Sequence, residues 1–131
     1  YGWYQDRKVN IDNIIQYFAE CELHTFKKGL DFLEEFSGLN ISINNKITNS
    51  VIELNALKGI ENSAYLEDIE SYFRIKLMPI GYWRAMNRTL YIDEIGIIYG
   101  NTDGFVTIFG NSFHEALDNI INLKTIKNFL V

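Results

Sequence analysis

The stretch LMPIGYWRAMNRTLYIDEIGIIYGNTDGFVTIFG, residues 77–110, predicts the centre of the fold. Its apolar residues are mostly β-branched or aromatic, and they do not repeat at the 3.6-residue period of a helix. The linkers at residues 93–96 and 101–104 each end on a glycine, which can adopt the left-handed conformation that closes a short hairpin loop. We therefore expect a central β-meander, with strands over residues 89–93, 96–100 and 104–109.

Helical periodicity flanks this meander on both sides. Apolar residues recur at three- and four-residue spacing in four segments, and each segment begins near a capping residue. The expected helices cover residues 10–22, 25–36, 63–73 and 111–123, and their expected caps are Asn10, Thr25, Ser63 and Ser112. The apolar stripe expected in the second helix consists of Phe26, Leu30, Leu33 and Phe36. Two further strands are expected over 39–43 and 51–54, a short helical piece within 55–62, and a docked tail over 126–131.

This order of elements predicts an α+β fold, with a mixed, largely antiparallel sheet and about four helices packed around it. The length of 131 residues predicts that residues 1–131 form a single domain with a substantial core. Because the chain starts at Tyr1 rather than at a methionine, we expect the natural N-terminus to lie further upstream.

Composition excludes several classes of function. The chain has 47% hydrophobic and 22% charged residues, which is ordinary for a soluble globular protein. Its net charge of −5 argues against nucleic acid as a direct partner. No apolar run approaches the roughly 20 residues of a membrane span. The lone Cys21 excludes an internal disulfide and indicates a reducing compartment, so we expect the protein to be cytoplasmic.

Residues suited to catalysis are few. The two histidines, His24 and His114, have no metal-ligand partner at helical spacing. Cys21 is expected to be a small buried hydrophobic residue rather than a reactive thiol. No glycine-rich phosphate loop occurs, and the adjacent carboxylates of Asp93 and Glu94 fall in a turn, where solvation is the simpler explanation. We expect neither an active site nor a cofactor nor a metal.

Acidic residues are grouped in the sequence. No lysine or arginine lies between Arg88 and Lys124, and residues 61–70 contain four acids without a basic residue. The acids of these two stretches are Glu61, Glu67, Asp68, Glu70, Asp93, Glu94, Asp103, Glu115 and Asp118. An acidic face of this kind attracts a basic partner and speeds association, although it also serves simply as a soluble surface.

The run Tyr82-Trp83-Arg84 combines the residue types that are enriched at interface hot spots. Trp83 at a strand end is equally compatible with a core position. The predicted partner-binding residues are Glu67, Glu70, Tyr82, Trp83, Asp93, Glu94 and Asp103.

Several short motifs, taken in order, resemble the third branch of the SUKH superfamily, the immunity proteins of bacterial polymorphic-toxin systems. The resemblance covers essentially the whole chain. Its motifs are Gly2-Trp3, Arg7-Lys8-Val9, residues 33–39, Pro79-Ile80-Gly81, residues 90–93 with Gly96 and Tyr99, and residues 113–117. The chain departs at Ser37, where the family usually has a second glycine, and at Asn10, where aspartate is common.

This resemblance implies a SUKH-type α+β fold and a non-enzymatic role. The implied partner is the C-terminal domain of a cognate toxin, whose active site the immunity protein blocks, with no nucleic acid or membrane bound directly. Such toxins are often nucleases with basic substrate grooves, so the acidic stretches are interpreted as mimics of a nucleic-acid backbone. We expect a monomer or a weak homodimer.

Two other classes of function stay open at this point. The superfamily also includes regulatory scaffold proteins, and a protein-binding module of that type suits the same composition. A small-ligand or enzymatic domain would use the loop at residues 82–88, and it predicts a pocket lined by Trp83, Arg84 and a carboxylate with a perturbed pKa.

Overall fold

The computed structural model describes residues 2–124 and 127–131. Its helices are α1 (Asp12–Glu20), α2 (Lys27–Phe36), α3 (Ala56–Glu61), α4 (Leu66–Phe73) and α5 (Phe113–Ile121), with a short 3₁₀ turn, η1 (Arg84–Met86). Its strands are β1 (Asn40–Asn44), β2 (Asn49–Glu53), β3 (Leu77–Trp83), β4 (Arg88–Asp93), β5 (Ile98–Thr102), β6 (Phe105–Gly110) and β7 (Lys127–Leu130).

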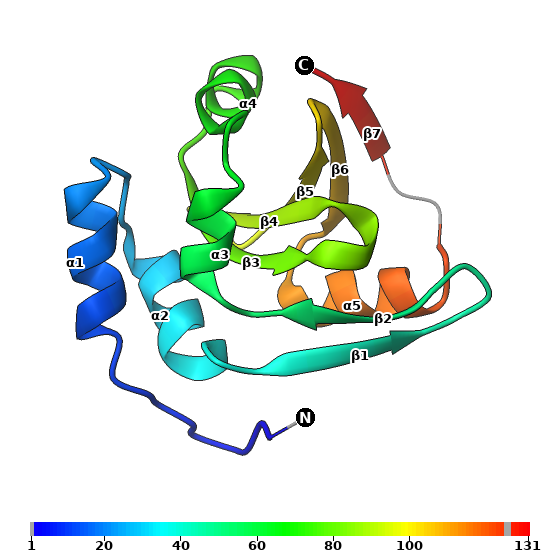
Figure 1. Cartoon of the computed structure of the whole chain (residues 1–131), viewed down its shortest axis with the longest axis horizontal. Coiled ribbons are helices and arrows are strands. Elements are labelled where there is room, and N and C mark those ends of the chain that lie inside the picture. The colour runs from blue at the N-terminus through cyan, green and yellow to red at the C-terminus, as the bar shows by residue number, and fades with distance from the viewer. Residues whose placement is uncertain (1, 125–126) are drawn as a thin grey trace.

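The strands form one sheet whose spatial order is the order of the chain, β1 to β7 (Figure 1). Every neighbouring pair among the described strands is antiparallel. The α+β class and the largely antiparallel sheet are therefore confirmed. The described helices outnumber the four expected, because the ambiguous segment 55–62 folds as α3.

The predicted central meander is confirmed to within two residues at each strand end. Asp103 and Gly104 both have positive φ, 50° and 89°, as a two-residue type I′ hairpin requires. Gly96 closes the β4–β5 turn with a φ of 100°. The right-handed twist of the strands matches this turn type, so the Asp-Gly pair determines the register of β5 and β6.

Strand β3 and helix α3 pack closely against each other, backbone to backbone. Its register on β4 shifts between Pro79 and Gly81, a bulge at the site where proline cannot donate a hydrogen bond. A Cβ atom on Gly81 would lie 2.5 Å from the Glu53 carbonyl oxygen, and one on Gly59 of α3 would lie 3.2 Å from the Gly81 carbonyl oxygen. Gly81 therefore allows a close approach of backbones that any side chain would prevent, and Gly59 allows a tight approach that a side chain would force slightly apart.

The two faces of the sheet bury separate apolar clusters. One face packs against α1, α2 and α5. There the ring centroids of Phe32, Phe36 and Phe113 lie 4.8–5.0 Å from one another. Phe32 was not in the expected stripe of α2 but is buried there. The other face packs against α4 around Tyr91 and Tyr99.

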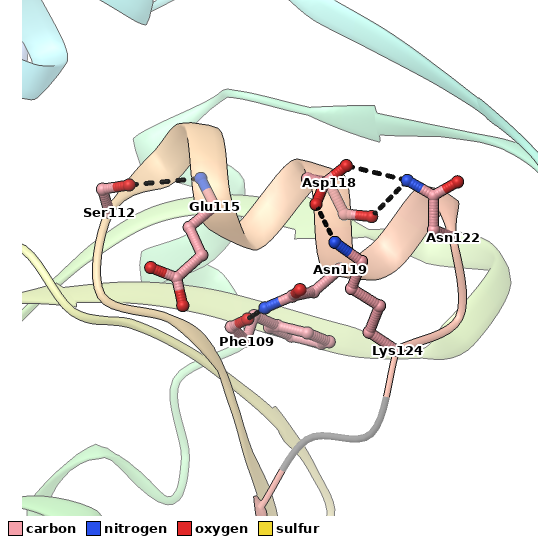
Figure 2. A network of polar contacts seen from close by, with 7 residues as sticks. All are labelled: Phe109, Ser112, Glu115, Asp118, Asn119, Asn122 and Lys124. Atoms are coloured by element: carbon pink, nitrogen blue, oxygen red, sulfur yellow. Dashed lines mark hydrogen bonds and ion pairs between the residues drawn. The ribbon is translucent and has the colours of Figure 1, made fainter.

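One of the expected helix caps is confirmed. The Ser112 hydroxyl accepts a hydrogen bond from the Glu115 amide at 3.1 Å, as Figure 2 shows. Asn10 was expected to cap the first helix, but Ile11 holds the cap position of α1 and its side chain makes no cap hydrogen bond. The Asn10 side chain accepts a hydrogen bond from the Asp12 amide at 2.8 Å just before the helix.

Two other expected caps are wrong. Helix α2 follows Phe26 rather than Thr25, and α4 follows Tyr65 rather than Ser63. The Ser63 hydroxyl instead donates to the Ile60 carbonyl at 2.6 Å, because the end of α3 has carbonyl groups that need donors.

The C-terminal segment was expected to be a docked tail, and it forms the edge strand β7 on β6. Ile126, which belonged to that expectation, lies outside the described residues. The Val131 amide donates to the Gly104 carbonyl at 2.9 Å, so β7 continues to the β5–β6 turn.

The Asp93 carboxylate organises the centre of the sheet. It is 4% exposed, and its Oδ1 accepts hydrogen bonds from the amides of Ile95 and Ile97 at 3.0 and 2.9 Å. Its Oδ2 accepts from the Tyr99 hydroxyl at 2.8 Å. One side chain therefore closes the β4–β5 turn and ties it to the next strand.

We expect Asp93→Ala to lower the free energy of unfolding by about 3 kcal/mol, because three hydrogen bonds to a buried carboxylate are lost and their donors stay buried. Glu94→Ala, at the exposed neighbouring position, should change it by less than about 0.5 kcal/mol. Urea denaturation of both variants measures the difference. Equal effects would show that the turn does not depend on this carboxylate.

Tyr91 carries a polar atom that the fold leaves without a partner. Its side chain is fully buried, and its hydroxyl has no hydrogen-bond partner among the described residues. Burial raises the pKa of Tyr91 far above the ordinary tyrosine value of 10.0. The folded state therefore holds this proton above pH 10, where the unfolded chain releases it.

We expect Tyr91→Phe to stabilise the protein by about 1 kcal/mol near neutral pH, because it removes a buried hydroxyl that makes no hydrogen bond. A raised pKa in the fold gives stability that is present below pH 10 and is lost as the pH rises above it. The wild type should therefore lose stability above pH 10 more steeply than the variant, by about 1.4 kcal/mol per pH unit. Parallel alkaline slopes in thermal melts would contradict this assignment.

Candidate functional site

The structure places three of the predicted partner-binding residues inside the protein. Tyr82 and Trp83 are 7% and 3% exposed, because β3 is buried on both faces. The Tyr82 hydroxyl donates to Asn87 at 2.9 Å, and the Trp83 indole donates to the Ser50 hydroxyl at 2.8 Å. Asp93 was expected to be a solvated turn residue, but it is buried, because its carboxylate accepts the three hydrogen bonds described above. These side chains support the fold and are not free surface groups.

Glu70 is also largely used within the fold. Its side chain is 15% exposed, and its Oε2 accepts a hydrogen bond from the Leu77 amide at 2.9 Å. The same oxygen lies 3.5 Å from the His24 imidazole. Glu70 therefore connects α4 to the start of β3 and to the segment after α1.

The remaining three predicted residues are exposed, but they do not form one face. Glu94 lies in the β4–β5 turn and Asp103 in the β5–β6 turn, so they stand at opposite ends of β5. Glu67 lies in the first turn of α4, close in sequence to Tyr65, which borders Gly104 of the β5–β6 turn. The structure thus brings Glu67 toward Asp103 and separates both from Glu94.

We call the group of Glu61, Glu67, Asp68 and Asp103 the acidic end. All four side chains are exposed. Two of them, Glu61 and Asp103, line one cavity of about 200 Å³ together with Tyr65. Figure 1 shows α4, the tip of the β5–β6 hairpin and the end of β7 grouped at this part of the molecule.

Hydrogen bonds hold the walls of the acidic end in place. The Thr89 hydroxyl donates to the Asn62 carbonyl at 2.5 Å, which fixes the α3–α4 connection against β4. The Asn101 side chain accepts from the Gly104 amide at 2.9 Å and stabilises the hairpin that carries Asp103. The segments that carry Glu61 and Asp103 are therefore held in place by hydrogen bonds to their neighbours.

The other face of the sheet has a second pocket at the same strand ends, which we call the arginine pocket. It measures about 230 Å³ and is lined by Asn45, Ile47, Thr48, Trp83, Met86, Arg88, Phe109, Asn119, Ile120, Leu123 and Lys124. Arg88 was not among the predicted partner-binding residues. The available signal was its alternation with Leu90 and Ile92, which face the apolar cluster on this side.

Arg88 is packed into this pocket by its neighbours. Its guanidinium carbon lies 5.8 Å from the ring centre of Trp83 and 5.4 Å from that of Phe109. Its Nε donates a long hydrogen bond, 3.4 Å, to the Thr102 hydroxyl. Burial lowers the pKa of Arg88 below its ordinary value, which nevertheless leaves the group charged at neutral pH.

The end of α5 forms one wall of the arginine pocket. Figure 2 shows the polar contacts of this helix end. Asn119 donates to the Phe109 carbonyl at 2.7 Å, which fastens the helix to β6. Lys124 forms an ion pair with Asp118, and Asn122 donates to the same carboxylate at 2.8 Å. The hydrogen bond from Lys124 lowers the pKa of Asp118, so this carboxylate already has its own cation.

The residues most often used in catalysis stay apart. Cys21 was expected to be buried, and it is exposed because it follows the last residue of α1, beyond the apolar stripe. His114 is exposed at the start of α5, with its ring 6.4 Å from that of Phe36. Within the described residues, no group of three or more histidine, cysteine or acidic side chains could hold a metal ion.

The pocket anticipated for an enzyme is not the one observed. Arg84 is exposed and lies over the Tyr82 ring, 5.6 Å from its centre, instead of lining the arginine pocket with Trp83. The described lining of that pocket contains no carboxylate. Burial raises the pKa of Tyr91 and Tyr99, but neither hydroxyl lines the acidic cavity or the arginine pocket.

Of the helices in the described part of the chain, none has the length and apolar character required to cross a membrane.

Comparison with known proteins identifies the family. The chain matches the model of the SUKH-3 immunity protein family over residues 1–123. No curated protein and no solved structure matches it. The match covers nearly the whole sheet and all five described α-helices. The chain therefore belongs to the SUKH-3 immunity protein family, within the SUKH superfamily.

Proposed function

We propose that this protein binds and neutralises the C-terminal domain of a cognate bacterial toxin, and that this domain is a nuclease. Membership of an immunity protein family supports a role in toxin immunity. The acidic end supports the nuclease part of the proposal, since a nuclease needs a basic groove to hold its substrate. The four exposed carboxylates of the acidic end are opposite in charge to such a groove and would complement it.

The single observation that carries the nuclease proposal is the convergence of Glu61 and Asp103 on one cavity. These residues are 42 positions apart in the chain, so only the fold brings them together. Glu67 and Asp68 extend the negative charge along the start of α4. Association steered by this charge would be fast and sensitive to ionic strength.

A pull-down from the source cells, with bound proteins identified by mass spectrometry, tests the immunity role directly. We expect recovery of a large toxin held through its C-terminal domain. Co-expression should then restore growth of cells that produce this domain, and the purified pair should show inhibited cleavage of DNA or RNA. Recovery of signalling proteins without protection in the growth assay would favour a scaffold role.

The acidic end can be tested with matched charge changes. We expect the triple variant E61Q/E67Q/D103N to bind the toxin domain about tenfold more weakly at low ionic strength and with a flatter salt dependence. The control variant D12N/E94Q/E115Q removes the same number of charges from exposed positions elsewhere. It should leave affinity nearly unchanged in titration calorimetry.

Equal losses in both variants would mean that net charge alone matters, and the acidic end would have no special part. No loss in either variant would remove the electrostatic argument for a nuclease partner. The immunity role itself depends on the growth assay and would stand in both cases.

A further inference from the structure

The charge of Arg88 is not neutralised within the described structure. Its guanidinium lies near two aromatic rings and donates to one hydroxyl, and no described carboxylate forms an ion pair with it. A guanidinium has five N–H donors, and among the described residues only Nε–H has an acceptor. No described residue accepts a hydrogen bond from the four donors on the terminal nitrogens, which leaves them to a ligand.

Arg7 provides a comparison, because its guanidinium forms hydrogen bonds within the protein. Its two terminal nitrogens donate to the backbone carbonyls of Glu35 and Ser37, the latter at 2.8 Å. Arg7 thus fixes the end of α2 and keeps few donors for anything else. Arg88 is similarly part-buried, yet no backbone carbonyl receives its terminal nitrogens among the described residues.

The position of Arg88 is determined by the strands around it. A Cβ atom on Gly100 would lie 2.8 Å from the Arg88 Cδ and 2.4 Å from the Phe109 ring, so this glycine leaves the space that the arginine stem fills. The rings of Trp83 and Phe109 lie near the guanidinium. The side chain is consequently held in place before any ligand binds, which lowers the entropy cost of binding.

The surroundings select the kind of ligand. Ile47, Met86, Ile120 and Leu123 make much of the lining apolar, and the other cation, Lys124, is already paired with Asp118. A planar guanidinium forms paired hydrogen bonds with a carboxylate, and such bonds are strong where water is partly excluded. The site therefore suits a carboxylate that is attached to an apolar neighbourhood.

We propose that the arginine pocket receives an aspartate or glutamate side chain of the bound toxin domain, with Arg88 as its ion-pair partner. This inference rests on the proposed immunity function and adds a second contact on the face opposite the acidic end. A partner with a basic groove and one acidic side chain near its edge would complement both sites. The pair of contacts would determine the orientation of the toxin as well as its affinity.

The pocket can be tested first without the toxin. Trp83 is one of only two tryptophans, so the variant Trp3→Phe makes the remaining fluorescence report on the pocket. We expect a saturable change with sodium hexanoate, and about tenfold weaker binding of hexanamide, which has the same shape without the charge. Equal binding of the two compounds overturns the proposal, as does tighter binding of inorganic phosphate than of hexanoate.

Variants at Arg88 then link the pocket to the toxin. Arg88→Met keeps an unbranched stem beside Gly100 and removes the charge, and Arg88→Lys keeps the charge without the planar donors. Arg84→Met is the matched control, because Arg84 also lies over an aromatic ring but is exposed outside the pocket. Circular dichroism melts establish that each variant is folded.

We expect Arg88→Met to abolish hexanoate binding and to weaken toxin binding about 30-fold, with a smaller loss for Arg88→Lys and none for Arg84→Met. Unchanged toxin affinity in folded Arg88→Met overturns this inference while growth protection still supports the immunity role. If the wild-type protein failed to protect cells that produce the toxin domain, the proposed function would be rejected, whether or not hexanoate binds the pocket.

Discussion

The buried carboxylate of Asp93 is the interaction on which the rest of the sheet depends. Three donors from the β4–β5 turn and from β5 converge on its two oxygens. A carboxyl group is buried without large cost only when hydrogen bonds replace its hydration. The turn can therefore close in one register, and that register determines which residues of β5 face each apolar cluster.

Both candidate binding features follow from this register. Strand β4 alternates Arg88, Leu90 and Ile92 toward one face with Thr89 and Tyr91 toward the other. Because the β3–β4 and β5–β6 turns lie at the same ends of their strands, one end of the sheet carries the acidic end on one face and the arginine pocket on the other. Opposite charges on two faces give a partner two distinct points of recognition.

Much of the fold could be predicted from local sequence. The Asp-Gly pair at residues 103–104, the glycine at 96 and the serine cap at 112 each act through backbone conformation or through a neighbour a few residues away. The expected caps at Asn10, Thr25 and Ser63 were wrong. The Ser63 hydroxyl bonds to the Ile60 carbonyl at the end of α3, a partner that its own helix pattern does not indicate. Strand β7 was missed because its pairing with β6 crosses the whole of α5.

The fold class and the acidic stretches were readable from the sequence, since they depend on periodicity, turn residues and composition, and short motifs carried the family resemblance. Which charges are available to a partner was settled by tertiary contacts. The fold buried Asp93, Tyr82 and Trp83, separated Glu94 from Asp103, and brought Glu61 beside Asp103. It also placed Arg88 between two rings without an acidic partner among the described residues. Burial and pairing are properties of contacts between distant segments, and no local pattern encodes them.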